Sequence, residues 1–334
     1  LRQYGLRDAD AIRATDIQLG HVSYCPVAQD FYAALGLLQR DLTLAKAFEH
    51  LSQAFSHNPE MTHREHKGFI PKGGDQTVML ANVDLHIHSK YSAAVSQDME
   101  LPQIAREAAR KGVKIVGTGD CLLPEWLDAV KALPEDEGLF VLGDTLFVLS
   151  VEVEDSHRVH HLILLPEISK AKELQESFAS RSTNLRTDGR PRLQMSGAEI
   201  ADVVLEADGL IGPSHAFTPW TGIFAHYRSL SECYQEKADA IRFIELGLSA
   251  DTDYADRIAD LASRTFLSNS DAHSPRANKL AREFNQMEMD APSYKDLALA
   301  IRREGGRRPT LNVGFYPAEG KYNRTACTRC FHQY

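Results

Sequence analysis

The sequence has no apolar run as long as the roughly 20 residues that a membrane-spanning helix needs. Its first residues also lack the basic, apolar and small-residue regions of a secretory signal. Cysteine is scarce, with five residues in the chain, and their scattered arrangement does not indicate a disulfide framework. We therefore predict a protein of the reducing cytoplasm without membrane contact.

Positive charge is also in deficit. Lys and Arg number 37 against 46 Asp and Glu, which gives a formal net charge of −9. A field of that sign repels nucleic acid, although divalent cations on acidic ligands would offset part of it. Arginine is nevertheless concentrated within Arg181–Arg192 and Arg302–Arg308, and each cluster is either a solvated surface or a set of phosphate contacts.

Composition and patterning divide the chain into three segments. Residues 1–77 carry two helical patterns followed by a stretch rich in His, Lys, Gly and Pro, and they predict a helical segment of open role. From residue 78, short apolar runs alternate with amphipathic stretches, which predicts an α/β fold with a mostly parallel sheet, closed as a barrel. We expect this domain to cover 78–292 and a separate C-terminal segment to cover 293–334.

Polar residues fall at the carboxyl ends of the predicted strands, which is the edge where α/β sheets and barrels bind ligands. The first strand ends in VDLHIHSKYS, and alternation places Asp84, His86 and His88 on one face. Two imidazoles on one face can hold the same cation, since imidazole suits Zn, Mn and Fe. On its own, this H-x-H motif is a weak indication.

Similar residues recur at later strand ends. SNSDAH places Asp271 and His273 on one face. GTGD, SVEVE, HHL and PSH supply, in order, Asp120, Glu152, His160 or His161, and His215. This mixture suits two or three divalent metals, which lower the pKa of a bound water and neutralise charge on a phosphoryl group. The pattern predicts phosphoester hydrolysis, although amidohydrolase chemistry could use a similar cluster.

Together these motifs resemble the PHP (polymerase and histidinol phosphatase) superfamily over residues 78–292. The resemblance implies a distorted (β/α)7 TIM-like barrel that holds Zn, Mn, Fe or Mg. His161 matches the family's motif better than His160, because it directly precedes an apolar run. Cys121 and Ala94 depart from the family's ligand pattern, so two metals are a safer expectation than three. The implied metal ligands are His86, His88, Glu152, His161, His215, Asp271 and His273, and the implied catalytic residues are Asp271, His273, Glu152 and Asp120.

Within the superfamily, the sequence resembles the endonuclease Q family through DLHIHSKYS, VGTGD with PEWL, VHHLILLP, TDGRPRL, PSHAFTPW, ELGLSAD, SNSDAHSP and PAEGKY. This resemblance implies an endonuclease that cuts DNA 5′ of uracil or hypoxanthine, or at abasic sites, with the lesion nucleotide flipped out. Arg190 would then hold phosphate, while Trp220 and Tyr91 would stack on bases. For Trp220 a place in the core is the alternative. Damaged DNA is the expected partner, with replication or repair proteins as further candidates.

The C-terminal stretch KYNRTACTRCFHQY holds one C-x-x-C pair, Cys327 and Cys330, which is half of a zinc-binding module. The resemblance implies a second pair, so we interpret this segment as truncated and expect a separate structural Zn only if the module is complete. Two alternatives to the endonuclease stay open. One is a PHP phosphatase acting on a small phosphorylated metabolite, and the other is a module that binds DNA without cutting it.

Overall fold

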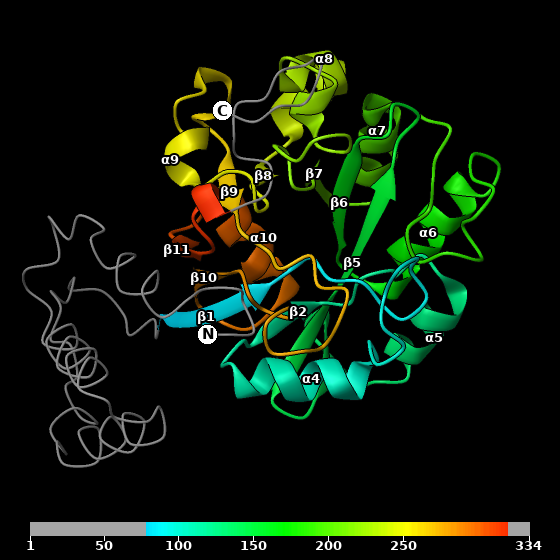
Figure 1. Cartoon of the computed structure of the whole chain (residues 1–334). Helices are drawn as coiled ribbons and strands as arrows, with labels where there is room; N and C mark the ends of the chain where they lie inside the picture. The colour runs from blue at the N-terminus through cyan, green and yellow to red at the C-terminus, as the bar shows by residue number, and fades with distance from the viewer. Residues whose placement is uncertain (1–77, 320–334) are drawn as a thin grey trace, which may run out of the picture. The chain divides into compact units, whose positions relative to one another are not determined.

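A mixed β-sheet with helices around its outside forms the centre of residues 78–319, the part of the chain that the computed structural model describes (Figure 1). The prediction of an α/β fold is confirmed for this part. The predicted helical segment of residues 1–77 and the Cys327–Cys330 pair lie outside the described residues. None of the helices between residues 78 and 319 has the length and apolar character needed to cross a bilayer.

The strands, in chain order, are β1 (Met79–Asp84), β2 (Ile115–Gly117), β3 (Glu135–Asp136), β4 (Leu139–Leu142), β5 (Thr145–Glu154), β6 (His160–Leu165), β7 (Leu210–Pro213), β8 (Phe243–Glu245), β9 (Thr265–Leu267), β10 (Phe284–Met289) and β11 (Arg308–Val313). The α-helices are α4 (Leu101–Arg110), α5 (Pro124–Lys131), α6 (Ile168–Phe178), α7 (Gly197–Glu206), α8 (Leu230–Tyr234), α9 (Thr252–Ala255) and α10 (Tyr294–Arg302). Short 3₁₀ turns are η4 (Ile223–Ala225), η5 (Gln235–Ala240), η6 (Ala259–Leu261) and η7 (Pro317–Glu319).

Within residues 78–319, nine strands form one sheet, in which β11, β10, β1, β2, β5, β4 and β3 are successive neighbours and β6 and β7 continue from β5. Strands β8 and β9 form a separate parallel pair. An isolated bridge between Ile87 and Ala272 joins the chain just after β1 to the chain just after β9. The carboxyl ends of β1 and β9 therefore lie side by side, and this contact builds the site described below.

The prediction of a mostly parallel sheet is wrong for the described residues. Pairs β1–β2, β2–β5 and β8–β9 are parallel, but β1–β10, β10–β11, β3–β4, β4–β5, β5–β6 and β6–β7 are antiparallel. The cause is clear between β5 and β6, because the connection 155–159 is too short for a crossover and must form a hairpin. Asp155 stabilises this turn by accepting the backbone N–H groups of His157 and Val159, both at 2.8 Å.

Helix α4 shows how the sequence forms the outer layer. Leu101, Ile104 and Ala108 are buried at three- and four-residue steps, so one face of the helix packs on the sheet. Pro102 lies in the first turn, where its missing N–H leaves no helical hydrogen bond unmade. Gly112 follows the helix with a φ of +69°, the left-handed conformation that commonly ends helices.

Strands β5 and β6 carry side chains into two separate layers, since both strands are buried on both faces. Val148 of β5 shares one apolar cluster with Leu162 of β6, and Val151 of β5 shares the other with Ile163 of β6. Even-numbered positions of both strands therefore face one way and odd-numbered positions the other. This phase decides which polar residues of β5 and β6 reach the site.

Between α9, which ends at Ala255, and β9, the chain contains only the 3₁₀ turn η6. In the C-terminal segment, β11 pairs with β10, and α10 lies against both strands. The described part of that segment thus extends the sheet, and a domain boundary at residue 292 stays a prediction.

Candidate metal centre

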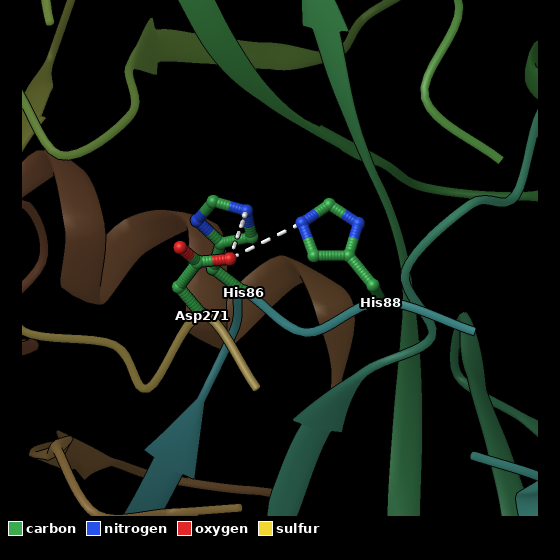
Figure 2. Close-up of side chains that lie close together, drawn as sticks. All are labelled: His86, His88 and Asp271. Atoms are coloured by element: carbon green, nitrogen blue, oxygen red, sulfur yellow. Dashed lines mark ion pairs between the residues drawn. The ribbon is translucent and has the colours of Figure 1, made fainter. Parts of the chain in front are cut away.

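Three polar side chains converge where β1 and β9 end. His86 and His88 follow β1 and are buried, while Asp271 follows β9 and is partly exposed. One oxygen of Asp271, Oδ1, lies 3.7 Å from Nε2 of His86 and 3.2 Å from Nε2 of His88, as Figure 2 shows. The three side chains thus present ligand atoms to one point, as a shared cation requires.

Glu152 of β5 joins this group to a second one, formed with His160 and His215. Its Oε1 lies 2.9 Å from Nδ1 of His160 and 2.9 Å from Nε2 of His215. The carboxylate also approaches Nε2 of His86 at 3.6 Å and Nε2 of His88 at 3.5 Å. Because Glu152 contacts both groups, it is the side chain suited to bridge two metals.

Two buried carboxylates hold the imidazoles in orientation. Glu245 at the end of β8 lies 2.9 Å from Nδ1 of His86, and Asp120 after β2 lies 3.2 Å from Nδ1 of His88. Asp120 also accepts the Ser89 hydroxyl at 2.5 Å, and the catalytic role expected for it stays a prediction. A carboxylate on one ring nitrogen fixes the tautomer and strengthens the other nitrogen as a metal ligand.

The donor set fits divalent metals. Among the described residues, Nε2 of His86, Nε2 of His88, Nδ1 of His215 and Oδ1 of Asp271 are buried without a hydrogen-bond partner. Each unpartnered polar atom costs about 1–3 kcal/mol on burial, so their collection in one place indicates a shared ligand. Imidazole together with carboxylate is compatible with several divalent metals, and the metal's identity stays open.

Charges in the centre are strongly coupled. Burial lowers the pKa of His86, but the carboxylates of Glu245 and Glu152 outweigh it and raise that pKa to about 9. For His88, burial is likewise outweighed by two neighbouring aspartates, which hold its pKa well above the usual value. Burial raises the pKa of Glu152, but adjacent imidazoles hold it well below the usual value. The metal-free centre therefore carries protons that a bound cation would displace.

His273 and Arg190 lie at the edge of the centre and line a cleft of about 410 Å³. The His273 ring lies 4.7 Å from that of His88, and its Nδ1 donates to the carbonyl oxygen of Asp271 at 2.9 Å. Burial lowers the pKa of His273, which favours a neutral ring with a free lone pair on Nε2. Arg190 donates from Nη1 to Oε2 of Glu152 at 3.2 Å, so its positively charged guanidinium lies between the acidic cluster and the cleft.

The structure brings His160 to the centre and not His161, the residue predicted from the motif. His161 occupies the opposite layer of β6, where its Nδ1 lies 2.7 Å from the Tyr234 hydroxyl and its Nε2 lies 3.3 Å from Asp155 Oδ2. Strand alternation allows only one of two adjacent residues to face Glu152. Apolar residues follow on both faces of β6, so the apolar run after His161 could not show which of the two histidines faces the site.

The two aromatic residues predicted to contact substrate lie outside the centre. Trp220 is 62% exposed, so a place in the core is excluded, and it stands between two threonines that line the cleft, Thr218 and Thr221. Tyr91 is 39% exposed and packs edge-to-face on Trp126, with ring centroids 6.2 Å apart. Their contacts with a substrate stay predictions.

Cys121, which departs from the family's ligand pattern, is buried in the apolar core.

Three residues of the centre have an unusual backbone conformation. Asp120, His215 and Asp271 have φ angles of +53°, +29° and +46°, in the left-handed region that non-glycine residues avoid. Such conformations cost roughly 1–3 kcal/mol each and collect at functional sites. The chain therefore accepts strain where it holds these side chains.

The chain is similar to two curated proteins and to solved endonuclease structures. No protein-family model matches the chain. It is 30% identical to the uncharacterised protein YqxK of Bacillus subtilis over 74% of this chain and 68% of that protein, and 44% identical to the uncharacterised protein MJ0043 of Methanocaldococcus jannaschii over 43% of this chain and 17% of that protein. The lesion-specific endonuclease PfuEndoQ from Pyrococcus furiosus is 46% identical with a TM-score of 0.73, over 77% of this chain and 64% of that one.

A second structure, endonuclease Q in complex with a 27-mer duplex substrate that carries an abasic lesion at the active site, matches with the same identity and TM-score over 65% of its length. The fold and these similarities support the resemblance to the PHP superfamily that the sequence motifs indicated. Within that superfamily it is close to endonuclease Q. The chain spans just under two thirds of the endonuclease Q chains and 17% of MJ0043.

Proposed function

We propose that the chain is a metal-dependent DNA endonuclease that cleaves the phosphodiester 5′ of deaminated bases such as uracil and hypoxanthine, or at abasic sites. The observation that carries this proposal is the set of buried, unpartnered imidazole and carboxylate atoms at the edge of an arginine-lined cleft. The similarity to endonuclease Q, one structure of which holds duplex DNA with an abasic lesion, supports DNA as the substrate.

The residues divide the chemistry between them. His86, His88, Glu152, His160, His215 and Asp271 would hold two divalent metals, and His273 stays a candidate ligand to a third. When bound, the metals would supply a water of lowered pKa as the nucleophile and neutralise charge on the phosphoryl group. Cleavage would leave a 3′-hydroxyl and a 5′-phosphate.

Side chains at the cleft would serve the substrate directly. Arg190 would hold the scissile phosphate, since a guanidinium matches two phosphate oxygens at once. Nε2 of His273 would either join a third metal or accept a proton, and not both, because Nδ1 of that ring already donates to a carbonyl oxygen. Trp220 and Tyr91 would stack on bases near the lesion.

We also propose that the strands close into the distorted seven-stranded barrel. Strands β1, β2, β5, β6 and β7 follow one another by pairing, and β8 pairs with β9. Gly212 of β7 approaches Phe243 of β8 so closely that an added Cβ would lie 2.5 Å from the Phe243 carbonyl oxygen. The Ile87–Ala272 bridge would close the ring between β9 and β1. Repair-protein partners and a cytoplasmic location stay part of this proposal.

The test is a nicking assay on end-labelled duplexes that carry one deoxyuridine or one abasic site, with Mn²⁺ or Mg²⁺ supplied. The chain is compared with Asp271→Ala and with Asp253→Ala, which changes an exposed aspartate of α9. We expect a nick immediately 5′ of the lesion with the unchanged chain and the Asp253 variant. Asp271→Ala and an undamaged duplex should give none.

Two other results would change the proposal. Hydrolysis of small phosphomonoesters without any nick would indicate a phosphatase. Lesion-dependent binding without cleavage of either substrate would indicate a binding module.

A further inference from the structure

Two exposed arginines, Arg192 and Arg158, line the cleft beside the metal centre. Arg192 follows the half-buried Arg190 by two residues in an extended segment, and a bridge between Arg192 and Glu154 holds this segment beside β5. Pro191, which lies between them in the sequence, is buried, whereas Arg190 and Arg192 both line the cleft, as strand alternation requires. Arg158 reaches the same cleft from the hairpin between β5 and β6.

A chain of contacts connects these arginines to the centre. His160 lies 2.9 Å from Glu152 through Nδ1 and 3.2 Å from Glu154 through Nε2. Glu154 in turn lies 3.8 Å from Nε of Arg192. Arg158 and Glu154 line the same cleft. Arg192 therefore contacts Glu154, which in turn contacts the predicted ligand His160, so the arginine lies close to the metal centre without belonging to it.

We propose that Arg192 and Arg158 bind the backbone phosphate adjacent to the one that the centre cleaves, so that the cleft recognises a polynucleotide strand rather than an isolated phosphate ester. This inference rests on the proposed function. Side chains two residues apart in an extended segment are separated by about 6.6 Å, so Arg190 and Arg192 can contact successive phosphates of one strand. Arg192 is 65% exposed and can pair with an anion from solvent.

Other arginines of the sequence clusters are engaged or placed elsewhere. Arg181 donates to the Gln194 carbonyl oxygen and to Glu199. Arg307 pairs with Asp290 and Arg308 with Glu288, and neither lines the cleft. Arg186 lines a different cavity, between α5 and α6. Arg186 is therefore a matched control, since it belongs to the same sequence cluster but lies outside the cleft.

The first measurement is the affinity for a fluorescent duplex with one abasic site, followed by anisotropy in EDTA between 50 and 200 mM KCl. We expect Arg192→Ala and Arg158→Ala each to weaken binding about tenfold. Because both arginines bind one phosphate, the Arg158→Ala/Arg192→Ala double variant should reduce the slope of log K against log salt by about 0.9, the value for one phosphate contact. Arg186→Ala should match the unchanged chain, and Arg192→Lys should keep the salt slope. Equal thermal unfolding midpoints would show that all variants fold.

The second measurement locates the phosphate. Duplexes carry a neutral methylphosphonate in place of one phosphate, either on the 5′ or on the 3′ side of the scissile position. At one of these positions the substitution should weaken binding of the unchanged chain about as much as the Arg158→Ala/Arg192→Ala double variant does, and it should cause no further loss in that double variant. Losses that add at both positions, or arginine variants with unchanged affinity and salt slope, would overturn the inference.

The two proposals fail in different ways. If the unchanged chain binds with the expected salt slope but never nicks, the proposed function fails and the phosphate subsite stands. If the unchanged chain nicks the lesion duplex while Arg192→Ala and Arg158→Ala bind like it, the subsite fails and the endonuclease stands.

Discussion

At the residue scale, the centre is organised by what each imidazole does with its two nitrogens. His86 and His88 each have Nδ1 on a buried carboxylate, and each directs an unpartnered Nε2 into the site. A metal ligand held in this way needs no reorganisation when the cation arrives. We therefore expect Glu245 and Asp120 to influence metal affinity although neither has to contact the metal.

Glu245→Gln tests this arrangement. Glutamine keeps the volume but loses the charge that raises the pKa of His86 and strengthens it as a ligand. We expect affinity for Mn²⁺ or Zn²⁺, measured by isothermal titration calorimetry, to fall about 10- to 100-fold. Glu125→Gln, at an exposed position of α5, is the control and should bind metal like the unchanged chain. A Glu245 variant with unchanged affinity would refute the positioning role.

Residue identities at the site were largely predictable, but their assignment to faces was not. Alternation alone placed His86 and His88 together, because VDLHIH changes between apolar and polar at each step. HHLILL has no such change, since both faces of β6 are buried. The choice between His160 and His161 depends on the register with β5, which pairs Glu154 with His160, and only the folded hairpin sets that register.

At the scale of elements, the site depends on how closely β1, β2 and β5 approach one another. A Cβ added to Gly117 at the end of β2 would lie 2.2 Å from the Leu85 carbonyl oxygen and 2.5 Å from the Ser150 hydroxyl oxygen. Leu85 immediately precedes His86, so any displacement there would move a predicted ligand. Glycine is needed at this position for space, because Gly117 does not have a positive φ.

Gly117→Ala should therefore disturb stability and the site together. Overpacking a buried position usually destabilises by about 1–3 kcal/mol. In a domain of this size that corresponds to a fall of roughly 3–10 °C in the unfolding midpoint. Differential scanning calorimetry would measure the fall, and a titration would show weaker metal binding. A midpoint within about 1 °C of that of the unchanged chain would mean that β1, β2 and β5 can move apart to accept the methyl group without loss of stability.

The order of elements was more predictable than their pairing. Strand and helix patterns from residue 78 to residue 255 depend on local periodicity, and most of those elements are present. Antiparallel pairing depends on connection lengths and on partners distant in sequence, such as β10 beside β1. Neither is visible in a single strand's pattern, and this is why a parallel sheet was the natural but wrong expectation.

At the scale of the whole molecule, the negative net charge and the proposed DNA substrate are compatible only if charge is unevenly distributed. The acidic side chains of the centre are predicted ligands whose charge bound cations would neutralise, and the cleft is lined by Arg158, Arg190 and Arg192. The sequence showed the arginine cluster but could not show which of its members line the cleft and which, like Arg181, form an ion pair elsewhere, here with Glu199. That separation is a property of the tertiary structure alone.

Metal binding should couple to the pH dependence of the whole protein's stability. The pKa of His86 is raised from 6.5 to about 9 in the folded metal-free protein, and that of His88 is raised as well. Between these pH values the folded protein retains protons that the unfolded chain has released. Metal-free stability should therefore fall as pH rises through this range, by up to about 1.4 kcal/mol per pH unit for each proton.

A bound cation displaces these same protons, so the metal-loaded protein escapes this loss. The difference in unfolding temperature between samples with excess Mn²⁺ and with EDTA should accordingly grow steadily from pH 6.5 to pH 9. Glu283, with a pKa raised by burial to about 7, also titrates in this range, but as it is not a predicted ligand its effect should largely cancel in the difference. His86→Gln should flatten the dependence. A difference that stays constant with pH in the unchanged chain would show that the imidazoles are not where the metal binds.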